Sequence, residues 1–260
     1  MPVITLTTDF GLSDHYVGAM KGVILSVCVG ARIVDITHGV ASYEISEAAF
    51  ALAQSWRYFP PKTVHVAVVD PGVGSPRRAI AASVGGHYFV APDNGVLSMV
   101  LTESGARVRT ITNQKYFRHP VSQTFHGRDI FASVAGHLAA GVSFAKLGPA
   151  IADYVRLSIT QPVRTARRGW TGAVLKIDRF GNIITNFAIT DFARIETQPF
   201  DCSIGLRVID RLAKSYAEMS TGEAYVIAGS SGFLEISVNR GSAAKILGVG
   251  VGAPIELRLL

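Results

Sequence analysis

"VHVAVVDPGVGSPRR", residues 64–78, sets an apolar run directly before a loop of glycines and prolines. The valines in it predict a buried strand, because β-branched residues are enriched in strands. Asp70 follows at the carboxyl end of that strand, and a loop with few side chains leads from it to Arg77. The stretch predicts either a plain surface turn or a loop that presents Asp70 and Arg77 to a ligand.

Strands and helices alternate through the first part of the chain. Further strand-like segments occur at 3–10, 31–37 and 87–93, and apolar residues recur at helical spacing over 16–27, after Ser42 and over 130–138. This alternation predicts an α/β sheet flanked by helices. Ligands of such sheets gather at the carboxyl ends of the strands, where Asp9, Asp70 and Asp93 stand.

After Arg168 the pattern changes to short strand-like runs separated by turn residues, and only residues 241–248 look helical. Such spacing is typical of a small antiparallel β domain. The sequence therefore predicts an α/β domain over 1–160, a polar linker over 161–170 and an antiparallel β domain over 171–260.

Bulk composition describes an ordinary globular protein. Of 260 residues, 48% are hydrophobic and 17% are charged, as in core-rich domains. No run reaches the ~18 apolar residues of a membrane span, and no signal peptide is visible. Cys28 and Cys202 lie far apart among apolar neighbours, which favours two buried free thiols and a cytoplasmic location over a disulfide.

The net charge of +6 raises the question of nucleic-acid binding. The basic residues are scattered, however, and the densest cluster, "VRTARR" at 163–168, fits a solvated linker. A metal site is not predicted, because His119, His126 and His137 lack metal-binding spacing and no CxxC occurs.

Three polar motifs in the first domain each permit a functional and a structural interpretation. In "TTDFGLSDHY" (7–16), Asp9 can accept hydrogen bonds from a ribose diol, whereas Asp14 or Ser13 also fits a helix cap. "DPGVGS" (70–75) lacks both the Gly-Lys-Ser/Thr ending and the GxGxxG of nucleotide loops. "TFHGRDIF" (124–131) places His126 before a helix, which suits proton chemistry or a structural hydrogen-bond network.

Five segments taken together resemble one family. They are "TTDFG…D", "DPGVGSPRR", "TFHGRD", "DRFGNIITN" (178–186) and "SSGFLEISVNRG" (230–241), and they run in order along nearly the whole chain. They resemble the SAM hydroxide adenosyltransferases, or S-adenosyl-L-methionine (SAM) hydrolases, which are relatives of fluorinase and chlorinase. The resemblance implies a Rossmann-like α/β domain followed by a small all-β, barrel-like domain.

The same resemblance implies the reaction of SAM with water to give adenosine and L-methionine, with SAM as substrate and no cofactor. It further implies a homotrimer that holds SAM between the first domain of one subunit and the second domain of the next. The scattered basic residues and the lack of a long apolar run predict no nucleic-acid or membrane partner.

Site residues carry over position by position. The catalytic set implied is Asp70, Arg77 and His126, in which Asp70 and His126 accept hydrogen bonds from a water and Arg77 orients the carboxylate. The resemblance assigns ribose to Asp9, the methionine part to Asp14 and Asp178, an aromatic contact to Tyr43, the adenine side to Phe180 and Asn182, backbone contacts to Val238, Asn239 and Arg240, and further substrate contacts to Phe125, Gly127, Ser230 and Ser231. Ser230 and Ser231 match a Ser-Arg pair that grips the carboxylate in fluorinase, and that Arg is missing here.

The halogenating relatives have Tyr where Asp70 stands, Thr where Val73 stands and Ser where Gly127 stands. A fixed carboxylate repels a halide, which favours water as the nucleophile. The alternatives are a halide-dependent SAM adenosyltransferase and a non-catalytic sensor that binds SAM or adenosine.

Overall fold

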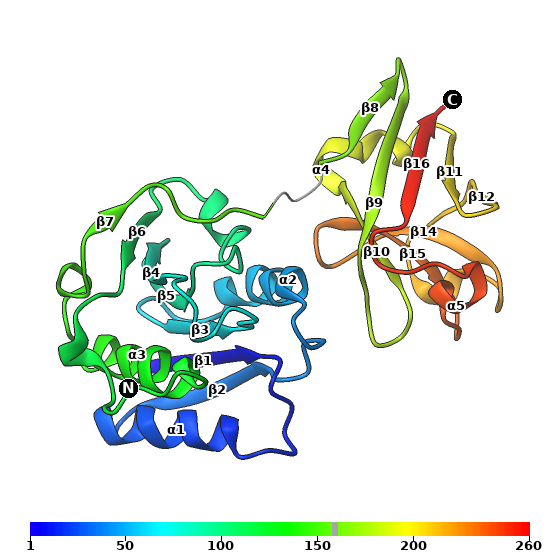
Figure 1. The fold of residues 1–260 in the computed structure, drawn as a ribbon. Helices are drawn as coiled ribbons and strands as arrows, with labels where there is room; N and C mark the ends of the chain where they lie inside the picture. Colours follow the sequence, from blue (N-terminus) through cyan, green and yellow to red (C-terminus); the bar gives the residue numbers. More distant parts are fainter. Residues whose placement is uncertain (158–160) are drawn as a thin grey trace. The chain divides into compact units, whose positions relative to one another are not determined.

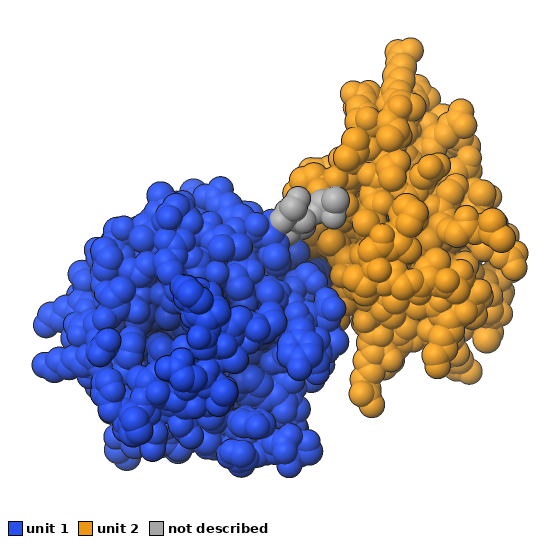
Figure 2. Space-filling view, viewed as in Figure 1, with its two compact units in different colours: residues 1–157 blue, residues 158–260 orange. Residues whose placement is uncertain are grey.

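The computed structural model describes residues 1–157 and 161–260. The chain divides into two compact units, the first spanning Met1–Leu157 and the second running to Leu260 (Figure 2). The domain boundary expected at residue 160 lies outside the described residues.

Unit 1 is built on a seven-stranded sheet of order β2-β1-β3-β5-β4-β6-β7 (Figure 1). The strands are β1 Val3–Thr8, β2 Arg32–Thr37, β3 Val64–Val68, β4 Ala79–Val84, β5 His87–Pro92, β6 Arg107–Thr110 and β7 Ala150–Ile151. β1, β2, β3 and β5 run parallel, whereas β4 pairs antiparallel with both β5 and β6. The parallel strands therefore direct their carboxyl ends to one edge of the sheet.

Helices cover both faces of this sheet. Helices α1 (Tyr16–Val27) and α3 (Ser133–Ala139) share one core cluster with β1 and β3, and α2 (Ile45–Ser55) belongs to the cluster on the other face. All five residues of β3 are buried, as expected of a parallel strand covered on both sides. The chain leaves β3 just before Asp70, so Asp70 follows the most enclosed strand of the unit.

Unit 2 contains a nine-stranded sheet that curls like half a barrel (Figure 1). Its strands are β8 Val163–Ala166, β9 Gly169–Ile177, β10 Ile183–Ala188, β11 Phe200–Ile204, β12 Arg207–Ile209, β13 Leu212–Ala213, β14 Ala224–Ala228, β15 Phe233–Val238 and β16 Pro254–Leu259. All pairings in it are antiparallel except β13 with β14. The short helices are α4 (Ile189–Phe192) and α5 (Ala243–Leu247), and α5 falls within the predicted segment 241–248.

The segment expected to be a linker, 161–170, contains strand β8 and the start of β9, which pair with each other. All four residues of β8 are exposed. An exposed edge strand is polar for the same reason as a linker, so composition does not separate the two.

Both cysteines are buried free thiols, as predicted. Burial raises the pKa of the Cys202 thiol to about 12. Within the described ranges, no helix has both the length and the apolar character needed to cross a membrane.

Candidate active site

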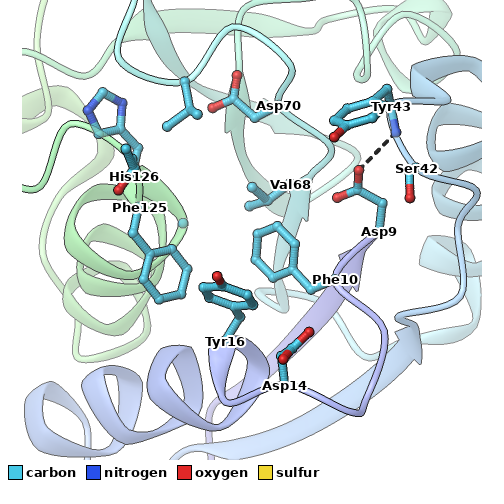
Figure 3. Close-up of a pocket in the computed structure, with 13 residues that line it drawn as sticks. Asp9, Phe10, Asp14, Tyr16, Ser42, Tyr43, Val68, Asp70, Phe125 and His126 are labelled. Carbon is cyan, nitrogen blue, oxygen red and sulfur yellow. Dashed lines mark hydrogen bonds between the residues drawn. The ribbon is translucent and has the colours of Figure 1, made fainter.

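A pocket of about 380 Å³ opens in unit 1 where β1 and β3 end (Figure 3). That position fits the expectation that ligands of α/β sheets bind beyond the carboxyl ends of strands. Its volume lies in the range of small-molecule sites. The lining residues are Asp9, Phe10, Asp14, Tyr16, Ser42, Tyr43, Val68, Asp70, Val73, Thr124, Phe125, His126 and Gly127.

Asp70 and Arg77 form a bidentate ion pair beyond the carboxyl end of β3. Arg77 Nε donates to Asp70 Oδ1 at 2.8 Å, and Arg77 Nη2 donates to Asp70 Oδ2. The two side chains are only 5% and 11% exposed, so the pair is largely withdrawn from water. Paired N–H groups of this kind fix the plane of a carboxylate as well as its position. Asp70 therefore presents a defined face to the pocket.

The same guanidinium reaches His126. Arg77 Nη2 lies 2.8 Å from His126 Nδ1. A guanidinium has no acceptor, so Nδ1 must accept this hydrogen bond, and the proton of the neutral ring is assigned to Nε2. Burial lowers the pKa of His126 and the charge of Arg77 lowers it further, against the opposite influence of Asp70 and Asp129. The ring is consequently neutral at pH 7, with a hydrogen-bond donor at Nε2.

A buried carboxylate holds the segment that carries His126. His126 stands directly before a π-helical segment, Gly127–Ala132, that continues into α3. Asp129 within it is fully buried and accepts from Arg128 Nε at 2.7 Å and from the Ser122 backbone at 2.9 Å. Burial favours a higher pKa for Asp129, but these bonds and the nearby arginine charges outweigh it and lower the pKa. The charged group ties the incoming loop to the helix and so fixes where His126 lies.

The loop after β1 supplies the opposite side of the pocket. Asp9 Oδ2 accepts a hydrogen bond from the Tyr43 backbone at 3.0 Å (Figure 3). Tyr43 adopts a positive φ of 71° and exposes 70% of its surface. Asp14 is exposed and lines the pocket, while α1 is preceded by His15 without a side-chain cap. The capping alternative for Asp14 and Ser13 is therefore wrong.

Three aromatic rings form one wall. The centroid of Phe125 lies 6.0 Å from that of Phe10 and 5.1 Å from that of Tyr16. Gly127 lies against this wall, where an added Cβ would come within 3.3 Å of the Phe125 ring. Phe10 and Tyr16 were missed as pocket residues by the sequence analysis, although both lie within the quoted motif at 7–16. Isolated aromatic residues carry no spacing signal that would have singled them out.

Asp93, which also follows a strand, is used elsewhere. Its Oδ2 accepts from Arg78 Nε at 2.8 Å and its Oδ1 accepts from the Val155 backbone at 2.8 Å. The buried carboxylate is thus part of a structural ion pair with the partly exposed Arg78 and does not line the pocket. The part of the chain that the structure describes contains no cluster of three or more metal-ligating side chains.

The remaining predicted residues belong to unit 2. Asp178 Oδ1 accepts from the backbone of Phe180 and of Asn182, each at 2.8 Å, and Asp178 Oδ2 accepts from Asn182 Nδ2 at 2.8 Å. Asn182 is buried, while Phe180 is 77% exposed at the tip of the turn. Asp178 therefore shapes the turn that presents the Phe180 ring.

A second group lies on and around β15. Ser231 Oγ donates to Glu235 Oε1 at 3.3 Å, and Ser230 is exposed. Burial raises the pKa of Glu235. Val238 packs its side chain into the core of unit 2, and Asn239 Nδ2 donates to the Met219 carbonyl at 2.8 Å. Arg240 is exposed at a positive φ of 54°. Val238 and Asn239 thus leave mainly backbone groups to a ligand.

Comparison with known proteins matches the two units, in order, to the two domains of one family. Residues 4–148 match the N-terminal domain of the SAM hydroxide adenosyltransferases, and residues 172–256 match the C-terminal domain of the same family. The chain belongs to the SAM hydroxide adenosyltransferase family.

Individual relatives cover almost the whole chain. An (R)-S-adenosyl-L-methionine hydrolase of Salinispora tropica is 38% identical over 96% of this chain and 95% of its own. A fluorinase of Actinoplanes sp. is 27% identical over 98% of this chain and 97% of its own. The crystal structure of an uncharacterized conserved protein from Thermotoga maritima matches with a TM-score of 0.91 and 39% identity, covering 98% of this chain and 99% of that one.

Proposed function

We propose that this protein is a SAM hydrolase that converts SAM and water into adenosine and L-methionine. The observation that carries the proposal is the Asp70 carboxylate, which is held by Arg77 beside a neutral His126 in a pocket of nucleoside size. Relatives named (R)-S-adenosyl-L-methionine hydrolase, at 36–39% identity over nearly the whole chain, support the same activity.

The proposed chemistry is a single displacement at the ribose 5′ carbon. The water oxygen forms a bond to that carbon while the carbon–sulfur bond breaks, and methionine leaves as a neutral thioether. Because the sulfonium is already a good leaving group, the enzyme has to supply a well-placed and partly deprotonated water. In-line placement at about 3–3.5 Å contributes as much as basicity. The reaction is redox-neutral, so the proposal includes no cofactor.

We assign different roles to the two groups beside the water. Asp70 is the proton acceptor, because a carboxylate that receives two N–H bonds from Arg77 still has free lone pairs. His126 donates from Nε2 to the water oxygen and orients it, because its Nδ1 is occupied by Arg77. This assignment differs from the sequence-based expectation that both groups accept.

Substrate binding is proposed to follow the family pattern. Asp9 binds the ribose hydroxyls. Asp14, from the same loop as Asp9, and Tyr43, from the loop between β2 and α2, contact the substrate, and Phe125 and Gly127 border it from the other side. In unit 2, the exposed Phe180 ring supplies a surface for the adenine face. The remaining unit 2 contacts are assigned to Asp178, Asn182, Ser230, Ser231, Val238, Asn239 and Arg240.

We further propose a homotrimer in which unit 1 of one subunit and unit 2 of the next complete each site. What supports this is the composition of the pocket, which draws all its lining residues from unit 1. In finer terms, the fold proposed is a Rossmann-like unit followed by a barrel-like all-β unit. A cytoplasmic location is proposed on the two free thiols.

Isotope labelling tests the reaction. The purified chain is incubated with SAM in oxygen-18 water, and adenosine is analysed by mass spectrometry. Label in the 5′-hydroxyl supports hydrolysis at that carbon. Chloride-dependent formation of 5′-chloroadenosine would instead identify a halide-using enzyme, and SAM binding without turnover would identify a sensor.

A further inference from the structure

Behind the pocket, two buried side chains link the end of β1 to the end of β2, and neither of them lines the pocket. Thr8 Oγ1 lies 2.8 Å from His38 Nδ1. The same hydroxyl oxygen accepts from the Phe10 backbone N–H at 3.2 Å. Thr8 is fully buried and His38 is 5% exposed, so these contacts are shielded from water.

His38 also holds the far end of the same loop. Its carbonyl accepts from the Gly11 backbone N–H at 2.8 Å. The loop of residues 8–11 is thus fixed at its start by the His38 ring and at its end by the His38 backbone. Asp9 and Phe10, which lie between these two points, are the loop's contributions to the pocket (Figure 3).

The hydrogen bonds have a consistent direction. The Thr8 oxygen accepts from Phe10, so its own proton is free to be donated to His38 Nδ1. The ring proton then sits on Nε2, which lies 3.1 Å from Asp35 Oδ1, although the geometry is too bent for a regular hydrogen bond. Asp35 Oδ2 accepts from Lys21 Nζ at 2.6 Å. A charged Asp35 therefore favours the one ring tautomer that accepts from Thr8.

A local irregularity in the sheet explains how His38 reaches Thr8. Leu6 of β1 pairs with Asp35 of β2, but Thr7 pairs with Thr37, which leaves Ile36 as an extra residue. Such bulges redirect the side chains that follow them. The bulge lies at the point where the two strands deliver their loops to the pocket.

We propose that Thr8 and His38 are positioning residues for the nucleoside part of the substrate. They act by holding Asp9 and Phe10 in the conformation that binds the ribose, without touching the substrate themselves. This inference rests on the proposed function, in which Asp9 binds the ribose hydroxyls.

A pair of identical substitutions at adjacent residues tests it. Thr8→Val removes the hydroxyl but keeps the shape, and Thr8→Ser restores the hydroxyl. Thr7→Val is the matched control, because Thr7 is also fully buried in β1 and its Oγ1 has no hydrogen-bond partner among the described residues. Calorimetry measures adenosine binding, and steady-state kinetics measures kcat and KM for SAM.

We expect Thr8→Val to weaken adenosine binding and raise the KM for SAM about tenfold, which equals about 1.4 kcal/mol. The value of kcat should change less than threefold, because the groups around Asp70 are untouched. Thr8→Ser and Thr7→Val should both bind adenosine within twofold of the unsubstituted chain. The proposal is overturned if Thr8→Val binds adenosine normally, or if Thr7→Val loses affinity equally.

Hydrogen exchange separates this inference from the proposed function. In the free protein, Thr8→Val should increase amide exchange at Phe10 and Gly11 at least tenfold over Thr7→Val. If the unsubstituted chain neither binds adenosine nor hydrolyses SAM, the proposed function fails while exchange still reports the state of the loop. Should Thr8→Val not fold, His38→Asn and His38→Ala replace it. Asn keeps an acceptor near the Nδ1 position and should bind adenosine better than Ala, and equal binding by both would contradict the role of His38.

Discussion

Arg77 is the common partner of the two groups beside the proposed water. It donates to both oxygens of Asp70 and to Nδ1 of His126, and its guanidinium carbon lies 5.2 Å from the centroid of the Phe131 ring. A lysine has no fork of N–H groups with which to make these contacts together. At the scale of single residues, one cation therefore sets both the carboxylate plane and the imidazole tautomer on which the proposed chemistry relies.

Asp70→Asn should lower kcat for SAM hydrolysis by at least about 100-fold, because an amide is a far weaker proton acceptor and general-base contributions are about 10²–10⁴-fold. Adenosine affinity should stay within threefold. Asp153→Asn is the control, since Asp153 is an exposed carboxylate that pairs with Arg78 outside the pocket. Undiminished turnover in Asp70→Asn would remove Asp70 from the mechanism.

The pH dependence of kcat/KM should report His126. Protonation would place an imidazolium against the Arg77 guanidinium and remove the Nδ1 acceptor. Since burial and Arg77 lower the pKa of His126, activity should persist at pH 6.5 and fall only at more acidic pH. In His126→Asn, which cannot titrate, this acidic loss should disappear from the remaining activity. A midpoint above pH 6.5 would contradict the tautomer assigned here.

At the scale of elements, β3 contains one buried histidine in an otherwise apolar strand. His65 Nδ1 lies 2.8 Å from Thr5 Oγ1, and His65 Nε2 lies 3.2 Å from His87 Nδ1. Burial, assisted by the charge of His87, lowers the pKa of His65 to about 3. The folded chain therefore keeps His65 neutral at a pH at which the unfolded chain protonates it.

This difference makes unit 1 sensitive to acid. Unfolding takes up a proton at His65 between pH 6.5 and about 3. His65 therefore does not reduce the stability of unit 1 above pH 6.5, and it lowers that stability as the pH drops below this value. The loss should be roughly 3 kcal/mol by pH 4, at 1.36 kcal/mol per pH unit. In His65→Gln, the free energy of unfolding should depend less steeply on pH, by the equivalent of about one proton. In the control His119→Gln, at an exposed position, the pH dependence should match that of the unsubstituted chain. Urea unfolding in a Trp170→Phe background measures the stability of unit 1 at each pH. The remaining tryptophan, Trp56, belongs to unit 1, where its ring centroid lies 5.1 Å from that of His87.

The elements that the sequence predicted are those with a strong period. The valine run of β3 and the helical spacing of α1 and α2 can be recognised without tertiary information. β4 and β6 were missed because β4 is rich in alanine and β6 alternates arginine with smaller residues, which gives no strand signal alone. β4 is held as a strand by pairing with β5, and β6 by pairing with β4, and reasoning from local sequence does not register such pairings.

The candidate site likewise contains residues that local sequence reveals and residues that it does not. Asp70 and His126 drew attention because a strand end and a helix start are visible in the sequence, but their catalytic assignment came from the family resemblance. The link between Thr8 and His38 was missed because it joins residues 30 positions apart across a bulge. Asp93 shows that a position at a strand end does not by itself bring a carboxylate into the pocket, because Arg78 draws this one into an ion pair.

At the scale of the whole molecule, the proposed residues divide between two units with separate cores. The pocket itself is lined by unit 1 alone. A site completed by a second subunit makes activity dependent on assembly. Light scattering should then give a mass near three times 27.7 kDa, and a fully active monomer would contradict the trimer.

Mixing two inactive variants tests where the site is completed. Asp70→Asn disables unit 1 and Phe180→Ala disables the exposed ring of unit 2. If each site combines two subunits, mixed trimers contain some sites with both residues intact, and activity should rise well above the sum of the parents. If each site is built within one chain, no mixture regains activity. Refolding the variants separately and then combining them supplies the unmixed control.

The enclosure of β3 bears on how one scaffold can serve different nucleophiles. Every residue of that strand is packed between neighbours, so its path is set by the sheet and not by the reaction. In the proposed mechanism, changes confined to the turn after β3, including the position of Asp70, alter the nucleophile offered to the sugar while leaving the strand intact. A buried strand followed by a variable turn would allow one family to include both hydrolases and fluorinases among its members.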